Sequence, residues 1–330
     1  MTTLWDTTGT DVVKALAAER RLAGSVSSGL ALTLVVVVQE GDVGVAEQAA
    51  THAAAQHPCR LLMVVRRRPD APDPRLDAEV SVGGRLGPGE AVVMRMYGRL
   101  ALHAESVVLP LLGPDAPVVT WWFGEPPDMI AHDPLGVFAD RRVTDCSLAA
   151  DPLAALRRRA EDYAPGDTDL SWTRTTPWRA LCASAFDSVE ATPTAAQVTG
   201  RRGDPTASLL AGWLGRRLGV PVEVSDGARH PVEEVVFTVP DGEVRIRRND
   251  DRSAVLSRPG HGDRTLPLTG REVGDLLAEE LRRLDPDETY AEALEVATGE
   301  TGLSERSRRR THVWHDPTAD GDPDPALTTS

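Results

Sequence analysis

Hydrophobic and polar positions divide the start of the chain into segments of two kinds. The spacing of apolar residues over 9–23 predicts a short amphipathic helix, and its apolar side would hold Val12, Val13, Leu16 and Leu22. Residues 30–38, LALTLVVVV, form a nearly continuous apolar run rich in valine. Such a run is typical of a strand that is covered on both faces, in a sheet with helices on each side.

A strand–helix–strand unit follows from the next segments. An alanine-rich helix is expected over about 42–56, and CRLLMVV at 59–65 reads as a second buried strand. A strand, a helix and a second strand within about 36 residues are typical of a parallel βαβ unit.

Further strands complete a first domain that we expect to end at residue 150. Residues 66–77 contain three prolines and no periodicity, which indicates an exposed loop. The remaining elements are expected as strands at 79–82 and 91–97 joined by a glycine-rich hairpin loop, a helix over 99–112, and strands at 117–123 and 142–148. The fold class is therefore α/β, and residues 1–150 form a three-layer domain with a mostly parallel sheet.

A helical connector is expected over 151–200. Asp-Pro pairs at 151–152, 204–205 and 285–286 indicate helix starts, because Asp caps free amides and Pro fits the first turn. In the stretch DLSWTRTTPWRALCASAFD, residues 169–187, Thr176 can cap a helix that Pro177 begins. The apolar stripe of this helix would be Trp178, Leu181, Cys182, Ala185 and Phe186. This stripe favours burial of Trp178.

The second half has the pattern of a smaller α+β domain over 201–298. A helix at 205–218 is followed by strands near 221–224, 233–239, 242–248 and 253–259, with turns that suggest an antiparallel sheet. Thr269 and Glu272 form a capping box for the next helix, and a last helix runs to about 297. Residues 299–330 are polar and proline-rich, so we expect a disordered tail.

The charge balance restricts the kinds of molecule that the chain is expected to bind. The formal net charge is −14 and Lys14 is the single lysine, which argues against non-specific binding to nucleic acid or to an anionic membrane. The first residues lack a signal-peptide pattern, and the longest apolar run has nine residues, far short of the ~20 that a membrane helix needs. We therefore expect a cytoplasmic protein that does not bind membranes. Its own oligomeric state stays open.

Motifs for catalysis, cofactors and metals are missing from the sequence. The three cysteines, Cys59, Cys146 and Cys182, are far apart and fit neither a zinc site nor a disulfide framework. The turn QEGDVG after the first buried strand has acids where a bound phosphate would need amides, although Arg66–Arg68 follow the next strand. We expect no metal, no cofactor and no enzymatic activity, since no nucleophile, base or metal set is positioned.

Tryptophan and arginine provide the candidate contact residues. Tryptophan makes up half of the aromatic residues, and Trp and Arg often carry binding energy at protein interfaces. The candidates for binding a partner are Trp121, Trp122, Trp172, Arg174, Trp178 and Arg179. Trp121 and Trp122 point to opposite faces of a strand, so one of them needs a covering helix, the second domain or another protein. Burial inside this chain is the alternative for every one of them.

These segments together resemble a known family. LTLVVVVQEGDV, HPCRLLMVV, PVVTWWFGEPP, DLSWTRTTPWRALCASAFD and ASLLAGWLGRRLG are similar to the glucose-6-phosphate dehydrogenase assembly protein family, OpcA, over about residues 5–297. The resemblance implies a non-enzymatic partner of glucose-6-phosphate dehydrogenase. It would act as an assembly factor or allosteric activator that promotes the active oligomer and so supports NADPH production in the oxidative pentose phosphate pathway.

A rival hypothesis uses the βαβ unit differently. The first domain could bind a sugar phosphate or a nucleotide, as an enzyme or as a sensor, with Arg66–Arg68 near the ligand. The acidic first turn weighs against this hypothesis.

Overall fold

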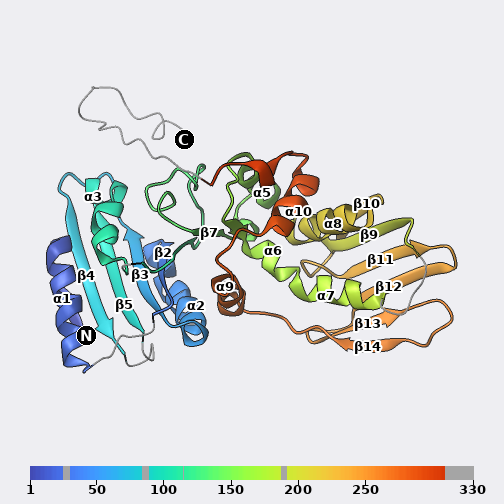
Figure 1. The fold of residues 1–330 in the computed structure, drawn as a ribbon, viewed down its shortest axis with the longest axis horizontal. Coiled ribbons are helices and arrows are strands. Elements are labelled where there is room, and N and C mark those ends of the chain that lie inside the picture. Colours follow the sequence, from blue (N-terminus) through green and yellow to red (C-terminus); the bar gives the residue numbers. More distant parts are fainter. Residues whose placement is uncertain (25–29, 84–88, 114, 187–191, 309–330) are drawn as a thin grey trace.

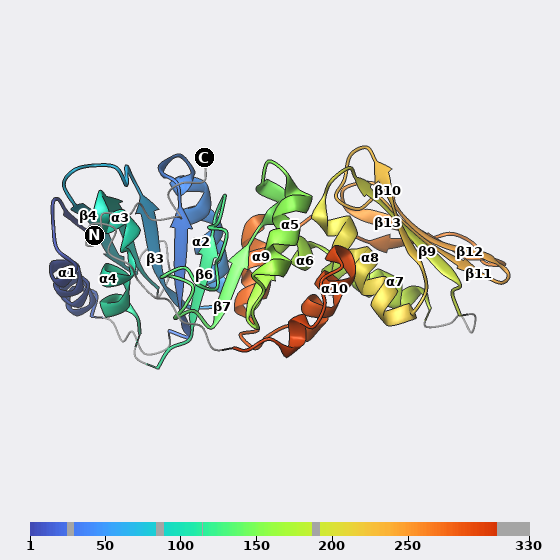
Figure 2. The same cartoon turned by 90° about the horizontal axis from the view of Figure 1, so that it is seen from above.

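Two lobes with a helical region between them make up the molecule (Figures 1 and 2). The computed structural model describes residues 1–24, 30–83, 89–113, 115–186 and 192–308. The predicted fold class is confirmed: the first lobe is an α/β unit with a mostly parallel sheet, and the second has a smaller sheet. No helix within these ranges is long and apolar enough to cross a membrane.

The first lobe is built on an eight-stranded sheet in the order β1-β4-β5-β3-β2-β6-β7-β8. The pairs β1–β4 and β4–β5 are antiparallel and all the others are parallel. The strands are β1 (Thr2–Leu4), β2 (Leu32–Val38), β3 (Cys59–Arg66), β4 (Arg75–Val82), β5 (Glu90–Tyr97), β6 (Val118–Trp122), β7 (Arg141–Thr144) and β8 (Asp167–Asp169). All seven residues of β2 are buried, as its nearly continuous apolar sequence predicts for a central parallel strand.

Helices cover both faces of this sheet, which confirms the three layers. On one face lie α1 (Gly9–Leu22) and the short helices α3 (Arg99–Leu102) and α4 (Glu105–Val108). On the other face lie α2 (Val43–Gln56) and, from far along the chain, α9 (Val273–Leu281). Val35 and Val37 pack in the core under α1, α3 and α4, whereas Leu34 and Val36 pack in the core under α2 and α9. This is the alternation that a strand requires.

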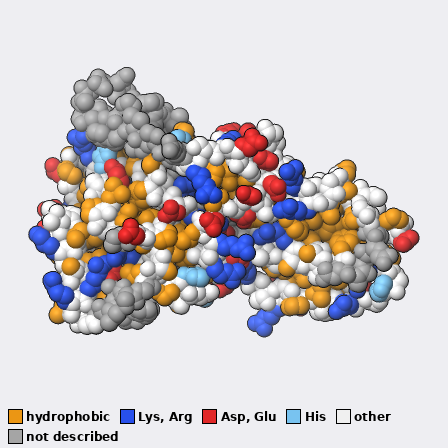
Figure 3. Space-filling view, in the orientation of Figure 1, with side chains coloured by type: hydrophobic (Ala, Val, Ile, Leu, Met, Phe, Trp, Pro, Cys, Tyr) orange, Lys and Arg blue, Asp and Glu red, His pale blue; other side chains and the backbone are white. Residues whose placement is uncertain are grey.

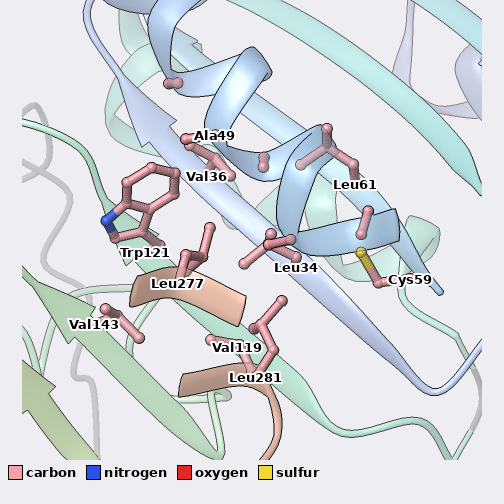
Figure 4. Close-up of a cluster of buried hydrophobic side chains, with 14 of the residues drawn as sticks. Leu34, Val36, Ala49, Cys59, Leu61, Val119, Trp121, Val143, Leu277 and Leu281 are labelled. Carbon is pink, nitrogen blue, oxygen red and sulfur yellow. The ribbon is translucent and has the colours of Figure 1, made fainter. Parts of the chain in front are cut away.

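The helix α9 packs directly against α2 and completes the core on that face of the sheet. Leu277 is fully buried, and Figure 4 shows it beside Trp121 and above Val143, with Leu281 next to Val119. Gly274 allows the close approach, because a Cβ there would lie 2.9 Å from the Cβ of His52 on α2. His52 Nε2 also lies 2.8 Å from Asp275 Oδ1. The first lobe therefore depends on residues from the last fifth of the chain.

The second lobe has a six-stranded sheet in the order β10-β9-β11-β12-β13-β14. Its strands are β9 (Ala195–Arg201), β10 (Val222–Gly227), β11 (Glu234–Val239), β12 (Gly242–Arg248), β13 (Ser253–Ser257) and β14 (Arg264–Pro267). The sheet is antiparallel as expected, except that β9 and β10 are parallel and joined through α8 (Pro205–Leu218). One face packs on α8 and on α7 (Thr176–Ala185).

Short helices fill the middle of the molecule. They are α5 (Pro152–Glu161), α6 (Leu170–Arg174) and α10 (Glu288–Thr298), and they share a core cluster with the inner side of α8. Gly212 on α8 sets the spacing to α10, because a Cβ there would lie 2.3 Å from the carbonyl oxygen of Ala293. Any side chain at position 212 would push these two helices apart.

Several expected boundaries are wrong for local reasons. The helix expected over 99–112 is broken at His103, whose φ and ψ of −116° and 42° are not helical. Leu22 is 81% exposed rather than part of the apolar side of α1. Asp287, not Asp285, caps α10 by accepting from the amide of Tyr290. The capping box of α9 consists of Glu272 and Asp275 rather than Thr269 and Glu272.

The ends of the expected domains also differ. The first sheet continues past residue 150, because β8 is its eighth strand and ends at Asp169. Part of the expected disordered tail is packed: Leu303 is fully buried, and Arg306 Nη1 donates to the carbonyl oxygens of Ala160 and Glu161. Residues 309–330 lie outside the described residues, so that part of the expectation is not addressed.

The position of α9 gives a first testable prediction. Leu277→Ala removes a fully buried side chain between α2 and Trp121, so it should lower the free energy of unfolding by about 2–5 kcal/mol. Val296→Ala, on an exposed part of α10, is the control and should change it by less than about 0.5 kcal/mol. Urea unfolding of both variants measures the difference; equal midpoints would show that α9 does not stabilise the first lobe.

Candidate functional site

Trp121 and Trp122 are both buried inside this chain. They are adjacent at the end of β6, and each side chain is 1% exposed. Trp121 packs on the face covered by α2 and α9 and meets Phe123 edge to face at 5.3 Å, whereas Trp122 packs on the opposite face. Of the possible covers for the second indole, it is the helix α9 that covers Trp121. Neither indole N–H has a hydrogen-bond partner among the described residues.

Trp172 fixes the junction between the lobes. Its ring is 1% exposed, and its Nε1 donates to Asp287 Oδ2 at 2.8 Å. Asp287 caps α10, so a single carboxylate joins α6 to α10. The guanidinium of Arg179 lies 3.8 Å from the centre of the Trp172 ring, a cation–π contact between α7 and α6. Burial is the main cause that lowers the pKa of Arg179 below its usual value.

Trp178 belongs to the core of the second lobe. It is 2% exposed and packs with Leu181, Cys182 and Ala185, as the apolar stripe predicts. The helix begins one residue earlier than expected, and Thr176 does not cap it: its hydroxyl donates to Glu279 Oε1 on α9 at 2.8 Å. Trp172 and Trp178 therefore belong to two different packed clusters.

Arg174 holds the end of β7 to α6. Its Nη1 and Nη2 donate to the two carboxylate oxygens of Asp145 at 2.7 and 2.6 Å, and Asp145 is 3% exposed. Burial opposes the charged form of Arg174, but the hydrogen bonds and charge of Asp145 outweigh it and raise the pKa. This two-point geometry is the strongest form of an Arg–carboxylate contact.

A second buried ion pair joins the first sheet to α9. Arg141 on β7 donates through Nε to Glu280 Oε2 at 2.9 Å and through Nη1 to the carbonyl of Asp285 at 3.0 Å. Thr173 Oγ1 donates to the other oxygen of Glu280 at 2.5 Å. Arg141 is 2% and Glu280 5% exposed, so each charge depends on the other in the interior.

These contacts show where the structure puts the six candidate residues. Trp172, Arg174 and Arg179 meet at the junction of the lobes, with only the two arginines partly exposed. The indoles of Trp121, Trp122 and Trp178 are enclosed by the cores of the two lobes. Their role in binding a partner stays a prediction, and a direct contact would have to come from the arginines.

The start of α2 is occupied by ion pairs. Glu40, directly after β2, has its carboxylate 3.2 Å from Arg95 Nε and 3.7 Å from Arg67 Nε. Arg66, at the end of β3, lies 3.5 Å from Asp133. The arginines that could attract a phosphate at this edge of the sheet already face carboxylates, which weighs against the rival sugar-phosphate or nucleotide site.

The described residues show neither a reactive thiol nor a cluster of metal ligands. Cys59, Cys146 and Cys182 are free and buried, and burial raises the pKa of Cys59 to about 12 and of the other two as well. A thiol with a raised pKa is a poor nucleophile at neutral pH. No group of three potential metal ligands occurs in the part of the chain that the structure describes.

Sequence reasoning missed the partners of the candidate residues. Asp145, Glu280 and Asp287 complete the network, but they lie between 29 and 139 positions from the residues they contact. Only Asp287 carries a local signal, as an Asp followed three residues later by the first buried residue of a helix. A cavity of about 300 Å³ also opens beside Arg174 and Trp178, lined in addition by Arg248 and Arg271.

Two family models match the chain in succession. Residues 50–161 match a model described as the glucose-6-phosphate dehydrogenase subunit N-terminal domain, and residues 165–294 match the corresponding C-terminal domain, both of them OpcA models. The chain belongs to the OpcA family. The boundary between the two family models falls at residues 161–165, between α5 and β8. It lies close to the network around Trp172.

Individual relatives of this OpcA family chain are distant. A Synechocystis protein named as the OxPP cycle protein OpcA is 25% identical over 259 residues, which cover 69% of this chain and 49% of that protein. The chain thus spans about half the length of this curated relative.

Solved structures resemble the chain only weakly. KijD10, a 3-ketoreductase from Actinomadura kijaniata, has a TM-score of 0.42 at 15% identity, with 86% of this chain and 99% of that chain covered. An oxidoreductase from Sinorhizobium meliloti has a TM-score of 0.40 at 12% identity, with 80% and 86% covered. Likeness at this level carries no argument about function.

Burial of Trp178 gives a second prediction. Trp178→Ala should lower the free energy of unfolding by about 3–5 kcal/mol, because a large side chain leaves the core of the second lobe. Trp5→Ala is the matched control: this indole is 69% exposed, and its loss should cost less than about 0.5 kcal/mol. Denaturant unfolding, followed by circular dichroism, measures both differences. An unchanged midpoint for Trp178→Ala would refute the role of Trp178 as a core residue.

Proposed function

We propose that this protein binds glucose-6-phosphate dehydrogenase and favours its active oligomer, without catalysing a reaction itself. The observation that carries the proposal is the succession of two family models, both described as domains of a glucose-6-phosphate dehydrogenase subunit, over residues 50–294. Through this partner the protein supports NADPH production in the oxidative pentose phosphate pathway.

The use of charged residues inside the molecule supports a role in assembly. Arg141 forms a buried structural pair with Glu280, and Arg174 forms a structural pair with the buried carboxylate of Asp145. The edge of the parallel sheet, where α/β enzymes usually bind ligands, has Glu40 paired with Arg95 and Arg67. A body held together by such pairs is well suited to present a fixed surface to another protein.

The surface at the junction is rich in charge. On the face in Figure 3, arginine side chains gather where the two lobes meet, with acidic side chains beside them. Charged surfaces of this kind favour encounter and orientation of a complementary partner more than raw affinity. Arg179 is the candidate residue to test first, because it is partly exposed and has no ion-pair partner among the described residues.

The energy needed for activation is small. A regulator shifts an assembly equilibrium only by the difference in its affinity for the two states of its partner. A tenfold shift requires ~1.4 kcal/mol of differential binding, which one well-placed arginine contact can supply.

The third prediction concerns the complex itself. Multi-angle light scattering of the cognate dehydrogenase, with and without this protein, is run beside an assay of NADPH formation in the same samples. We expect a larger mass and a higher rate together. If neither the mass nor the rate changes, the proposed function is wrong.

Two matched variants locate the contact. Arg179→Gln should weaken the effect on mass and rate if the junction is part of the interface, whereas Arg21→Gln, which changes an exposed residue at the end of α1 in the other lobe, should leave both unchanged. Neither arginine forms an ion pair or a hydrogen bond with a carboxylate among the described residues, although the charges of Asp287, Glu279 and Glu280 act on Arg179. Equal behaviour of the two variants would place the contact elsewhere on the surface.

A further inference from the structure

The strand β10 forms an unprotected edge of the second sheet. It lies beyond β9 and next to α8 (Figure 1), and no further strand pairs with it among the described residues. It spans six residues, Val222–Gly227, and contains neither a proline nor a basic side chain. Exposed edges of this kind usually carry features that prevent pairing with another chain.

The other three edges of the two sheets are short or blocked. The strands β1 and β8 have three residues each, and all three residues of β8 are buried. The strand β14 has four residues, of which Arg264 is exposed and Pro267 lacks an amide proton. Within the described ranges, β10 is therefore the edge best suited to accept another strand.

The backbone groups of β10 alternate between β9 and the free side. The amide of Ala196 on β9 donates to the carbonyl oxygen of Pro221 at 3.0 Å. In a parallel pair, the backbone groups of alternate residues face the neighbouring strand. Because Val222 is in register with Ala196, the N–H and C=O groups of Val222, Val224 and Asp226 point away from β9. These are the donors and acceptors that an added strand needs.

An apolar groove lies beside these backbone groups. Its volume is about 570 Å³, and its walls come from β10, α8 and the end of α10. Val224 is 47% and Val296 is 51% exposed in this groove, and Gly215 on α8 adds no side chain to it. A strand paired with β10 would direct every second side chain to the α8 side of the sheet. The groove would accept an apolar side chain at that position.

The charge at this edge favours a basic strand over an acidic one. Glu223 is exposed and forms no ion pair or hydrogen bond among the described residues, whereas Asp226 is paired with Arg202 at 3.1 Å. Antiparallel pairing of two β10 strands about Val224 would place the two Glu223 side chains at diagonal positions on one face, where they repel each other. The formal net charge of −14 also opposes a second copy.

We propose that β10 accepts an extended segment of glucose-6-phosphate dehydrogenase as a seventh strand of the second sheet. The segment would alternate apolar side chains, which face the groove, with polar side chains that include a basic one beside Glu223. Main-chain hydrogen bonds along β10 would supply affinity, and the groove would supply specificity. This inference rests on the proposed function, since it locates a contact with the same partner, and it does not depend on the contact tested at Arg179.

Hydrogen–deuterium exchange of the full chain, with and without the cognate dehydrogenase, tests this contact. Light scattering of the same samples follows the formation of the complex. We expect the segment that covers β10 to exchange at least tenfold more slowly in the complex, because the amides on its free side become hydrogen-bonded. The segment that covers β14, at the opposite edge of the sheet, should not change.

Two variants and a matched control assign the contact. Val224→Pro removes an amide on the free side of β10, and Gly215→Leu fills the groove, so each should weaken the complex at least tenfold. Thr265→Pro on β14 is the control. The amide of Leu268 donates to the carbonyl of Arg252 on the other side of this strand pair, so Thr265 directs its own amide away from β13. Circular dichroism verifies that all three variants fold like the parent chain.

The outcomes separate this inference from the proposed function. If the complex forms but β10 exchanges as fast as in the free protein, the inference is wrong and the proposed function stands. The same holds if Val224→Pro and Gly215→Leu bind like the parent chain, or if Thr265→Pro weakens the complex equally. If no complex forms, both are wrong. Slow exchange of β10 in the protein alone, increasing with its concentration, would identify a second copy as the occupant and would also overturn the inference.

Discussion

A parallel sheet must be covered on both faces, and in this chain one cover is supplied from far away. The βαβ unit provides α2, but α2 alone does not enclose Trp121, Val119 and Val143. Leu277 and Leu281 of α9 close that face (Figure 4). The chain therefore leaves the first lobe, builds the second sheet and returns, so the stability of each lobe depends on the other.

The buried polar network follows from this return of the chain. Where β7 meets α9, backbone and side-chain polar groups leave water, and unpaired groups there would cost several kcal/mol. Arg141 pairs with Glu280 where β7 meets α9, and Arg174 pairs with Asp145 where β7 meets α6. Trp172 adds a hydrogen bond to Asp287 and a ring for Arg179. The concentration of Trp and Arg over 172–179 has its first explanation in this junction.

Local patterns predicted the elements but not their partners. The apolar run at 30–38, the stripe around Trp178 and the Asp-Pro starts of α5 and α8 depend on neighbours in sequence, and they gave the correct elements. The strands β9 and β14 were missed, because AAQVTGR and RTLP have weak alternation and gain their order from pairing. Burial of Trp121 under α9 and the cavity beside Arg248 arise from contacts across more than a hundred residues or between separate elements, which one sequence cannot reveal.

The central claim is that α9 and the Arg141–Glu280 pair make the two lobes one cooperative body. Native-state hydrogen exchange along a urea series tests it most directly, by comparing amides of β2, α9 and β12. The account predicts that all three lose protection together in one transition. Loss of protection in α9 and β12 at low urea, while β2 stays protected to the global midpoint, would contradict it.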